Sequence, residues 1–145
     1  MNLQSVHIRE FHFPTDYQQV YQLWESIEVG VHVGRSDTLA EIEKKMARDP
    51  DLFLVAEIAE KIVGTVIGGF DGRRGLIYHL AVAKEFRGRG IGSSLLNKVE
   101  SRLRSKGCLK SYLMVTPDND EAAHYYERHG WHHMDYVRPY GKDLQ

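Results

Sequence analysis

Cysteine is nearly absent from the chain, which holds a single one, Cys108, among 145 residues. One thiol cannot form an internal disulfide, so the sequence excludes a disulfide-stabilised fold and fits a reducing compartment. Cys108 follows Gly107 at the start of an apolar stretch. Because free cysteine usually behaves as a small buried residue, we expect Cys108 in the core and not as a covalent acyl carrier.

An excess of charge of either sign is also missing, since 19 Lys and Arg stand against 20 Asp and Glu, for a formal net charge of −1. Nucleic-acid-binding domains are usually markedly basic. The Arg-Gly-Arg-Gly stretch at 87–90 is only one short copy of a pattern found in nucleic-acid-binding tracts. We therefore expect no nucleic-acid partner, and a nucleic-acid adaptor is the least favoured function.

Long apolar runs are absent, and residues 1–7 lack the charged and apolar regions of a secretion signal. These absences predict a cytoplasmic protein without a membrane partner. A length of 145 residues suits one domain, which we expect to span residues 1–145.

Apolar spacing predicts the order strand, two helices, three strands, helix, strand, helix and two short extended pieces. The predicted strands span 6–11, 52–59, 62–70, 76–82 and 108–116, and the extended pieces span 131–133 and 136–143. Capping residues place helix starts after Asp16 or Thr15, after Thr38 and after Asn119, and a further helix, with Ile91, Leu95, Val99 and Leu103 on its apolar face, follows the glycines. We expect a turn at Glu60-Lys61, and a bulge or close backbone approach at Gly64, Gly68 and Gly69.

The stretch from Arg87 to Gly92 lies between the predicted strand 76–82 and the helix that follows it. Glycines leave room for a ligand to approach the backbone, and the first turn of a helix offers unpaired N–H groups. This arrangement suits a phosphate or pyrophosphate. The spacing fits neither the dinucleotide fingerprint nor the P-loop, and it reads Arg-x-x-Gly-x-Gly.

That motif resembles the pyrophosphate-binding signature of the GCN5-related N-acetyltransferase (GNAT) superfamily. A second stretch, from Asn119 through Ala122 to Tyr126-Glu127 and Gly130-Trp131, is similar to the family's N-x-x-A and Y-E-x-x-G-F segment, with tryptophan in the last position. The element order resembles the GNAT fold over almost the whole chain, as in the small stand-alone bacterial members. The resemblance implies an α/β (α+β) fold with about four helices and a mixed, mostly antiparallel sheet of six to seven strands.

The resemblance also implies acetyl-CoA as co-substrate. The strand residues Leu80, Ala81 and Val82 would present backbone groups to the pantetheine arm and the thioester, in a gap where strands 76–82 and 108–116 splay apart. The residues implied to hold the pyrophosphate are Arg87, Gly88, Arg89, Gly90, Ile91, Gly92 and Ser93. Asn119 would fix the start of the last helix beside the acyl end.

In the chemistry that the resemblance implies, a primary amine attacks the thioester directly and Tyr126 is the general acid. A phenol with an ordinary pKa of about 10 stays protonated at neutral pH and can donate to the leaving thiolate. The N–H of Val82 would stabilise the oxyanion. A non-catalytic acyl-CoA sensor or adaptor of the same fold is the alternative, because Leu76 stands where several relatives carry a carboxylate.

The general base stays open between Tyr78, His79 and a water chain. Neighbours on a strand point to opposite faces, so only one of the two side chains is expected to face the site. Imidazole has the more suitable ionisation, whereas alignment with the family favours Tyr78.

No metal is predicted, because His132 and His133 would point apart and no cysteine or carboxylate pair joins them or His129. Trp24 is expected in the core. The acceptor, a small-molecule or peptide amine, is expected to contact residues 28–37 and the segment around Met134–Tyr136. A homodimer through edge strands is an open alternative.

Overall fold

The computed structural model describes residues 5–145, so part of the N-terminal stretch expected to lack a secretion signal, Met1–Gln4, lies outside the described residues. By its internal contacts the chain divides into two compact units, which we call unit 1, ending at Met114, and unit 2, Val115–Gln145. The prediction of one domain over residues 1–145 therefore stays a prediction.

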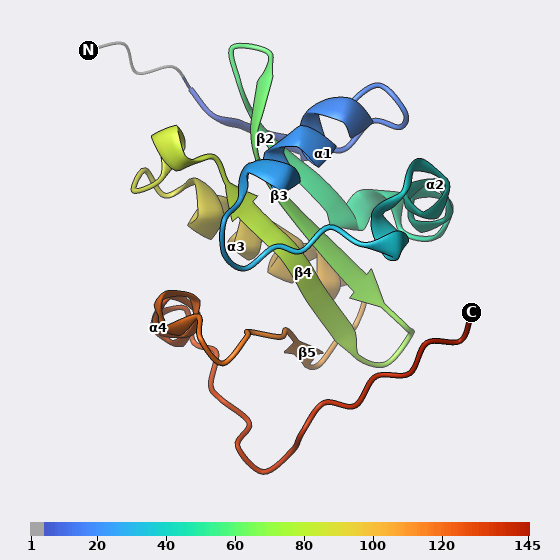
Figure 1. Ribbon diagram of the computed structural model, residues 1–145, viewed down its shortest axis with the longest axis vertical. Helices are drawn as coiled ribbons and strands as arrows, with labels where there is room; N and C mark the ends of the chain where they lie inside the picture. The colour runs from blue at the N-terminus through green and yellow to red at the C-terminus, as the bar shows by residue number, and fades with distance from the viewer. Residues whose placement is uncertain (1–4) are drawn as a thin grey trace. The chain divides into compact units, whose positions relative to one another are not determined.

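Unit 1 is built on a five-stranded mixed sheet whose strands follow one another in the order of the chain. The first three pairings are antiparallel, and the last, between β4 and β5, is parallel. Figure 1 shows β3 and β4 running through the middle of the unit. The strands are β1 His7–Glu10, β2 Phe53–Ile58, β3 Lys61–Phe70, β4 Gly75–Val82 and β5 Ser111–Tyr112.

The prediction of six to seven strands was wrong. The predicted strand 108–116 shrinks to the two residues of β5, and residues 131–133 and 136–143 form no strand in the described structure. A strand needs a hydrogen-bonding neighbour, which an alternating pattern does not supply. The C-terminal pieces are mostly exposed and offer little apolar surface to hold them against a neighbour.

The described residues contain four α-helices, and the local start signals explain most of their boundaries. Thr38 accepts a hydrogen bond from the Glu41 N–H at 3.3 Å, and Asn119 accepts one from the Ala122 N–H at 3.2 Å, so both predicted caps are confirmed. Among the described residues no helix is both long and apolar enough to cross a membrane. The helices are α1 Tyr17–Ser26, α2 Leu39–Arg48, α3 Ile91–Ser105 and α4 Asp120–Arg128, with short 3-10 turns η1 Arg35–Asp37, η2 Pro50–Leu52 and η3 Lys84–Phe86.

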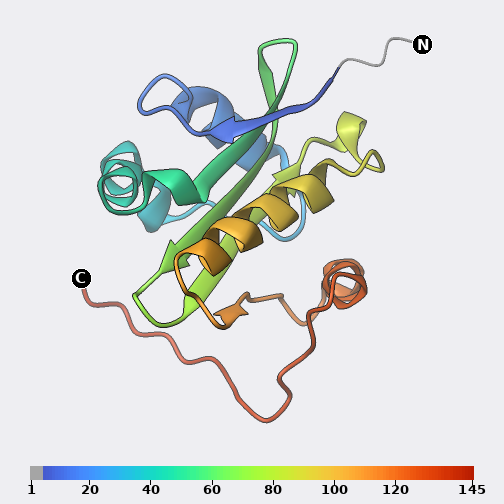
Figure 2. The ribbon, with the colours of Figure 1, turned by 180° about the vertical axis from the view of Figure 1, so that it is seen from behind.

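Helices α1 and α3 cover opposite faces of the sheet, as the two views in Figures 1 and 2 show. On the α1 face, Trp24 is 1% exposed and stacks near Phe53, which confirms its predicted place in the core. On the other face α3 lies against glycines of β3: a Cβ added at Gly68 would lie 2.7 Å from Val99 Cγ2. The predicted close approach is therefore confirmed at Gly64 and Gly68, whereas a Cβ added at Gly69 would make only an ordinary contact, 3.7 Å from Lys45 Nζ.

The hairpin between β2 and β3 turns one residue earlier than predicted. Ala59 and Glu60 both have positive φ, at 50° and 66°, and Ile58 pairs with Lys61. The turn is therefore Ala59-Glu60 and not Glu60-Lys61. Two left-handed residues match the twist of a tight hairpin, so strand pairing decided the turn position although neither residue is a glycine.

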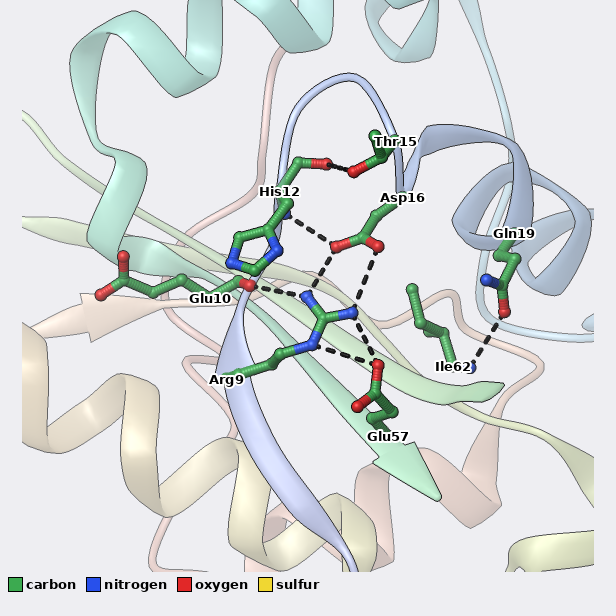
Figure 3. A network of polar contacts seen from close by, with 8 residues as sticks. All are labelled: Arg9, Glu10, His12, Thr15, Asp16, Gln19, Glu57 and Ile62. Carbon is green, nitrogen blue, oxygen red and sulfur yellow. Dashed lines mark hydrogen bonds and ion pairs between the residues drawn. The ribbon is translucent and has the colours of Figure 1, made fainter. Parts of the chain in front are cut away.

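A three-residue polar network fastens β1, β2 and the start of α1 together (Figure 3). Arg9 Nη1 lies 2.7 Å from Asp16 Oδ2, and Arg9 Nη2 lies 2.9 Å from Glu57 Oε2. The His12 N–H also donates to Asp16. Burial alone would raise the pKa of Asp16, but the hydrogen bonds from Arg9 and His12 outweigh it and lower that pKa. Asp16 stands at the predicted cap position yet makes no side-chain cap bond, because these partners occupy its carboxylate.

We expect Asp16→Asn to lower the free energy of unfolding at pH 7 by about 1–3 kcal/mol, because the half-buried Arg9 loses one of its two charged partners. Since the folded-state pKa of Asp16 is lowered, its contribution is present above the ordinary value of 3.8 and is lost as the pH falls through the lowered value. The difference between wild type and variant should therefore shrink in acid.

Urea unfolding at pH 7 and pH 3 measures both effects. Glu41→Gln is the matched control, because Glu41 pairs with a largely exposed Lys44, and its loss should change stability little. Equal destabilisation by the two variants would contradict the role assigned to Asp16.

Candidate functional site

The last six residues of β4 have a strand on one side only. Pairing with β5 is limited to Gly75 with Ser111 and Leu76 with Tyr112, whereas pairing with β3 continues to Val82. In the described part of the chain no strand pairs with residues 77–82 on the side opposite β3. Pairing between β4 and β5 thus ends after Leu76, which leaves residues 77–82 as an edge without a strand partner, called the free edge of β4 below.

The N–H of Val82 points toward this free edge. The next residue, Ala83, donates its N–H to the Val63 carbonyl on β3 at 2.8 Å. Backbone groups of successive strand residues point in opposite directions, so the N–H and C=O of Val82 face away from β3. In agreement, the Val82 carbonyl accepts a hydrogen bond from Arg87 Nε at 3.0 Å. The N–H on the same side is available to stabilise negative charge on a ligand oxygen.

The glycine-rich loop connects this end of β4 to α3. Gly88 and Gly90 have φ of +79° and +81°, and a Cβ added to either would meet nothing within 4 Å. The first backbone bond of α3 in this turn runs from the Ser94 N–H to the Gly90 carbonyl. The N–H groups of Ile91 and Gly92 precede it, so they have no intrahelical acceptor.

Two arginines of the loop add positive charge. Arg87 and Arg89 are exposed, and the Arg89 guanidinium lies over the Phe86 ring at 5.1 Å. Backbone donors, the positive end of α3 and these cations together suit a phosphate or pyrophosphate. The space left by the missing Cβ atoms allows such a group to reach the backbone.

A bulge in β4 displaces the residues just before the free edge. Ile67 pairs with Tyr78 and Thr65 with Ala81, so two residues of β4, His79 and Leu80, oppose one of β3. His79 has a φ of +52°. The rings of Tyr78 and His79 lie 5.5 Å apart, so the expectation that these neighbours point to opposite faces was wrong. The left-handed residue breaks the alternation on which that expectation relied.

The His79 ring is held by residues from two other parts of unit 1. Its Nε2 lies 2.9 Å from Asp37 Oδ1, and its ring contacts Trp24 edge-on at 4.7 Å. Asp37 is itself fixed, because its Oδ2 accepts the Gly34 N–H at 2.9 Å and its carbonyl accepts the Tyr17 hydroxyl at 2.7 Å. From the sequence, Asp37 is only the last residue of the segment 28–37 expected to contact the acceptor, since nothing local links it to a residue 42 positions away.

Tyr78 adds a neutral phenol to this group. Burial, with smaller contributions from the charges of Asp37 and Asp49, raises the pKa of Tyr78 to about 12. A phenol with that pKa stays protonated at neutral pH, so Tyr78 can donate a hydrogen bond but is a poor base.

Unit 2 holds the remaining predicted site residues. Asn119 caps α4, and Tyr126 lies two turns along that helix, with its ring 6.1 Å from that of Trp131. Burial, with a smaller effect of Tyr125, raises the pKa of Tyr126 to about 12. The structure thus groups Leu80–Val82 with Arg87–Ser93 in unit 1, and Asn119 with Tyr126 in unit 2.

Cys108 and Leu76, the two other residues discussed from the sequence, both lie near the start of β4 and its neighbour β5. Cys108 is half-buried, and its Sγ lies 3.3 Å from the Lys110 carbonyl. Leu76 is 37% exposed and pairs with β5. The described residues contain no group of three His, Cys, Asp or Glu side chains that could hold a metal ion.

Comparison with known proteins assigns the family. Residues 17–131 match the model of the acetyltransferase (GNAT) family. The crystal structure of Ard1 from Thermoplasma volcanium has 31% identity and a TM-score of 0.75, covering 86% of this chain and 81% of that one.

Two further structures share the fold at lower identity. The PaiA N-acetyltransferase from Thermoplasma acidophilum, in complex with coenzyme A, has 18% identity and a TM-score of 0.74, covering 86% of this chain and 88% of its own. The glucosamine-6-phosphate N-acetyltransferase from Arabidopsis thaliana has 20% identity and a TM-score of 0.70, covering 98% of this chain and 100% of its own. With the family match across most of its length, the chain belongs to the acetyltransferase (GNAT) family.

Proposed function

We propose that the protein is an acetyl-CoA-dependent N-acetyltransferase. The observation that carries the proposal is the free edge of β4, which leads directly into an open glycine loop at the start of α3. An acyl thioester on a diphosphate-bearing carrier needs both features, one for its extended arm and one for its diphosphate. The coenzyme A bound to the PaiA protein of the same fold supports this choice.

The residues present fit acetyl-CoA. Within Leu80–Val82, the backbone groups that face away from β3, those of Val82 among them, would bind the pantetheine arm, whereas Ala81 pairs with Thr65 on β3. The segment Arg87–Ser93 would bind the pyrophosphate through N–H groups and arginine side chains. Asn119 would hold the start of α4 near the acyl end. Bound acetyl-CoA supplies an acetyl group activated as a thioester. The proposed reaction uses no metal ion.

The reaction is direct attack of a primary amine on the thioester carbonyl. The carbonyl oxygen gains negative charge as the C–N bond forms, and the Val82 N–H stabilises it. The C–S bond then breaks, and Tyr126 donates a proton to the departing sulfur. A pKa of about 12 keeps the phenol protonated until the thiolate appears.

We also propose that residues 1–145 act as one domain. The family match from 17 to 131, which includes residues of both units, supports this. The acceptor is a small-molecule or peptide amine, contacted by residues 28–37 and by the segment around Met134–Tyr136. The protein acts in the cytoplasm.

The loop assignment is tested by Gly90→Ala, which we expect to raise the dissociation constant for acetyl-CoA about tenfold or more. The added Cβ stands where the diphosphate approaches the backbone, and a loss of about 1.4 kcal/mol corresponds to tenfold. Gly107→Ala is the matched control, because Gly107 has a similar φ of +89° and equal free space at the other end of α3.

Both substitutions should lower stability by about 1–2 kcal/mol through left-handed strain, but only the first should weaken acetyl-CoA binding in calorimetry. Equal affinities in the two variants would overturn the loop assignment.

The acid is tested by Tyr126→Phe, which we expect to lower kcat by about 10²–10⁴-fold without changing acetyl-CoA affinity, because only proton donation is lost. Tyr125→Phe, on the same helix, should keep near wild-type turnover. Release of coenzyme A is followed with lysine, spermidine, glucosamine and a peptide N-terminus as acceptors. Binding of acetyl-CoA without turnover of any amine by the wild type would favour the acyl-CoA sensor.

A further inference from the structure

The Asp37–His79 pair is a polar contact that neither strand pairing nor the proposed cofactor site requires. Its two side chains are 8% and 15% exposed and come from η1 and the β4 bulge. Asp37 has a partner on each side, so it presents one carboxylate oxygen to the imidazole in a fixed direction. This is the arrangement by which a carboxylate orients a histidine for proton transfer.

The contact decides which ring nitrogen is left to react. An ionised carboxylate only accepts hydrogen bonds, so Nε2 carries the hydrogen and donates it to Asp37. In the neutral imidazole Nδ1 then has a lone pair. Within residues 5–145 Nδ1 has no hydrogen-bond partner. Every buried side-chain nitrogen or oxygen in that range has a partner, so Nδ1 cannot be buried and must reach the surface.

The position of the ring along β4 places this lone pair near the reaction. His79 immediately precedes Leu80–Val82, the segment proposed to carry the thioester. The bulge and the φ of +52° bring the ring to the α1 face, where Trp24 and Asp37 hold it. A non-glycine residue in this conformation is strained, and such strain gathers at functional sites. Asp37 also ends the segment 28–37 expected to contact the acceptor.

We infer that His79 is the general base that takes a proton from the acceptor ammonium group, with Asp37 as its positioning residue. The inference rests on the proposed acetyltransferase function and names the acceptor as a protonated primary amine. A lysine-like ammonium ion ionises near pH 10.4, so at neutral pH it has no lone pair until a base removes a proton.

Nδ1 of His79 takes one proton from R–NH3⁺, and the resulting R–NH2 forms the C–N bond to the thioester carbon. The C–S bond breaks, and Tyr126 donates a proton to sulfur. The acetylated nitrogen gives up its second proton, which restores Tyr126. His79 releases the first proton to water, and the products are R–NH–COCH3, coenzyme A thiol and one H⁺.

The titratable groups placed around His79 are compatible with this role. Asp37 faces it from η1, Tyr78 from β4, and Tyr17 of α1 binds the Asp37 carbonyl. Burial raises the pKa of Tyr17 and of Tyr78, so both remain neutral over the pH range of an assay. Asp37 is therefore the carboxylate in direct contact with the imidazole during the reaction.

The test compares a basic and a weakly basic amine on the same enzyme. His79→Gln keeps a donor for Asp37 but cannot accept the proton, and Asp37→Asn removes the carboxylate while keeping its shape. The basic probe is whichever of lysine, spermidine, glucosamine or a peptide N-terminus the wild type acetylates fastest. The weakly basic probe is methoxyamine, which is already neutral at pH 7. Each variant is first checked for melting temperature and acetyl-CoA affinity.

With the basic amine we expect His79→Gln to lower kcat/KM by about 10²–10⁴-fold, and Asp37→Asn to lower it less and to shift the acidic limb of the pH profile. With methoxyamine we expect less than about threefold change in either variant. Equal losses on both amines would overturn the inference in favour of a structural role, and so would an unchanged profile on the basic amine. Either result would contradict only the role of His79, because turnover by the wild type would still support the proposed acetyltransferase function.

If the wild type acetylates neither class of amine, the proposed function itself fails, and this inference fails with it. Should His79→Gln not fold, the pH profile of Asp37→Asn on the two amines decides alone, because a purely structural aspartate would not separate them.

Discussion

The one-sided pairing of β4 is the constraint on which the rest of the structure depends. β3 holds β4 along its length, while β5 pairs with only its first two residues. Backbone groups inside a sheet are normally satisfied on both sides, so the freed edge carries donors that a ligand can use. The Val82 N–H, the loop after it and the His79 bulge before it are all arranged around this edge.

Glycines in β3 determine the position of the other part of the candidate site, the start of α3. A Cβ added at Gly64 would lie 3.0 Å from Leu95 Cδ1, and one added at Gly68 would lie closer still to Val99. Without side chains at these positions α3 packs tightly against the sheet. The start of α3 is thereby held next to the end of β4, so its first N–H groups and the free edge keep a constant geometry. A packing requirement in β3 thus determines where the proposed diphosphate site lies at the end of β4.

Local signals in the sequence were sufficient for the features that depend on neighbouring residues. The caps at Thr38 and Asn119 follow from hydrogen bonds within three residues, and the loop after Arg87 follows from glycines between a strand and a helix. Features that depend on distant partners were missed. Asp16 became a partner of Arg9 instead of a helix cap, and Asp37 meets His79 across 42 positions. The extent of β5 depended on where the chain after Tyr112 stops pairing with the edge of β4, which no local pattern in residues 108–116 encodes.

The left-handed backbone at His79 has a consequence for attempts to make the protein more robust. Glycine adopts this conformation freely and asparagine does so more readily than most residues, whereas histidine holds it at a cost of about 1–2 kcal/mol. Selection for heat resistance alone would therefore favour replacing the imidazole wherever this gain exceeds the loss of its contacts with Asp37 and Trp24. A variant library selected only for thermal stability would then lose the imidazole that contacts Asp37. Stability and turnover by the proposed base would therefore make opposite demands on residue 79.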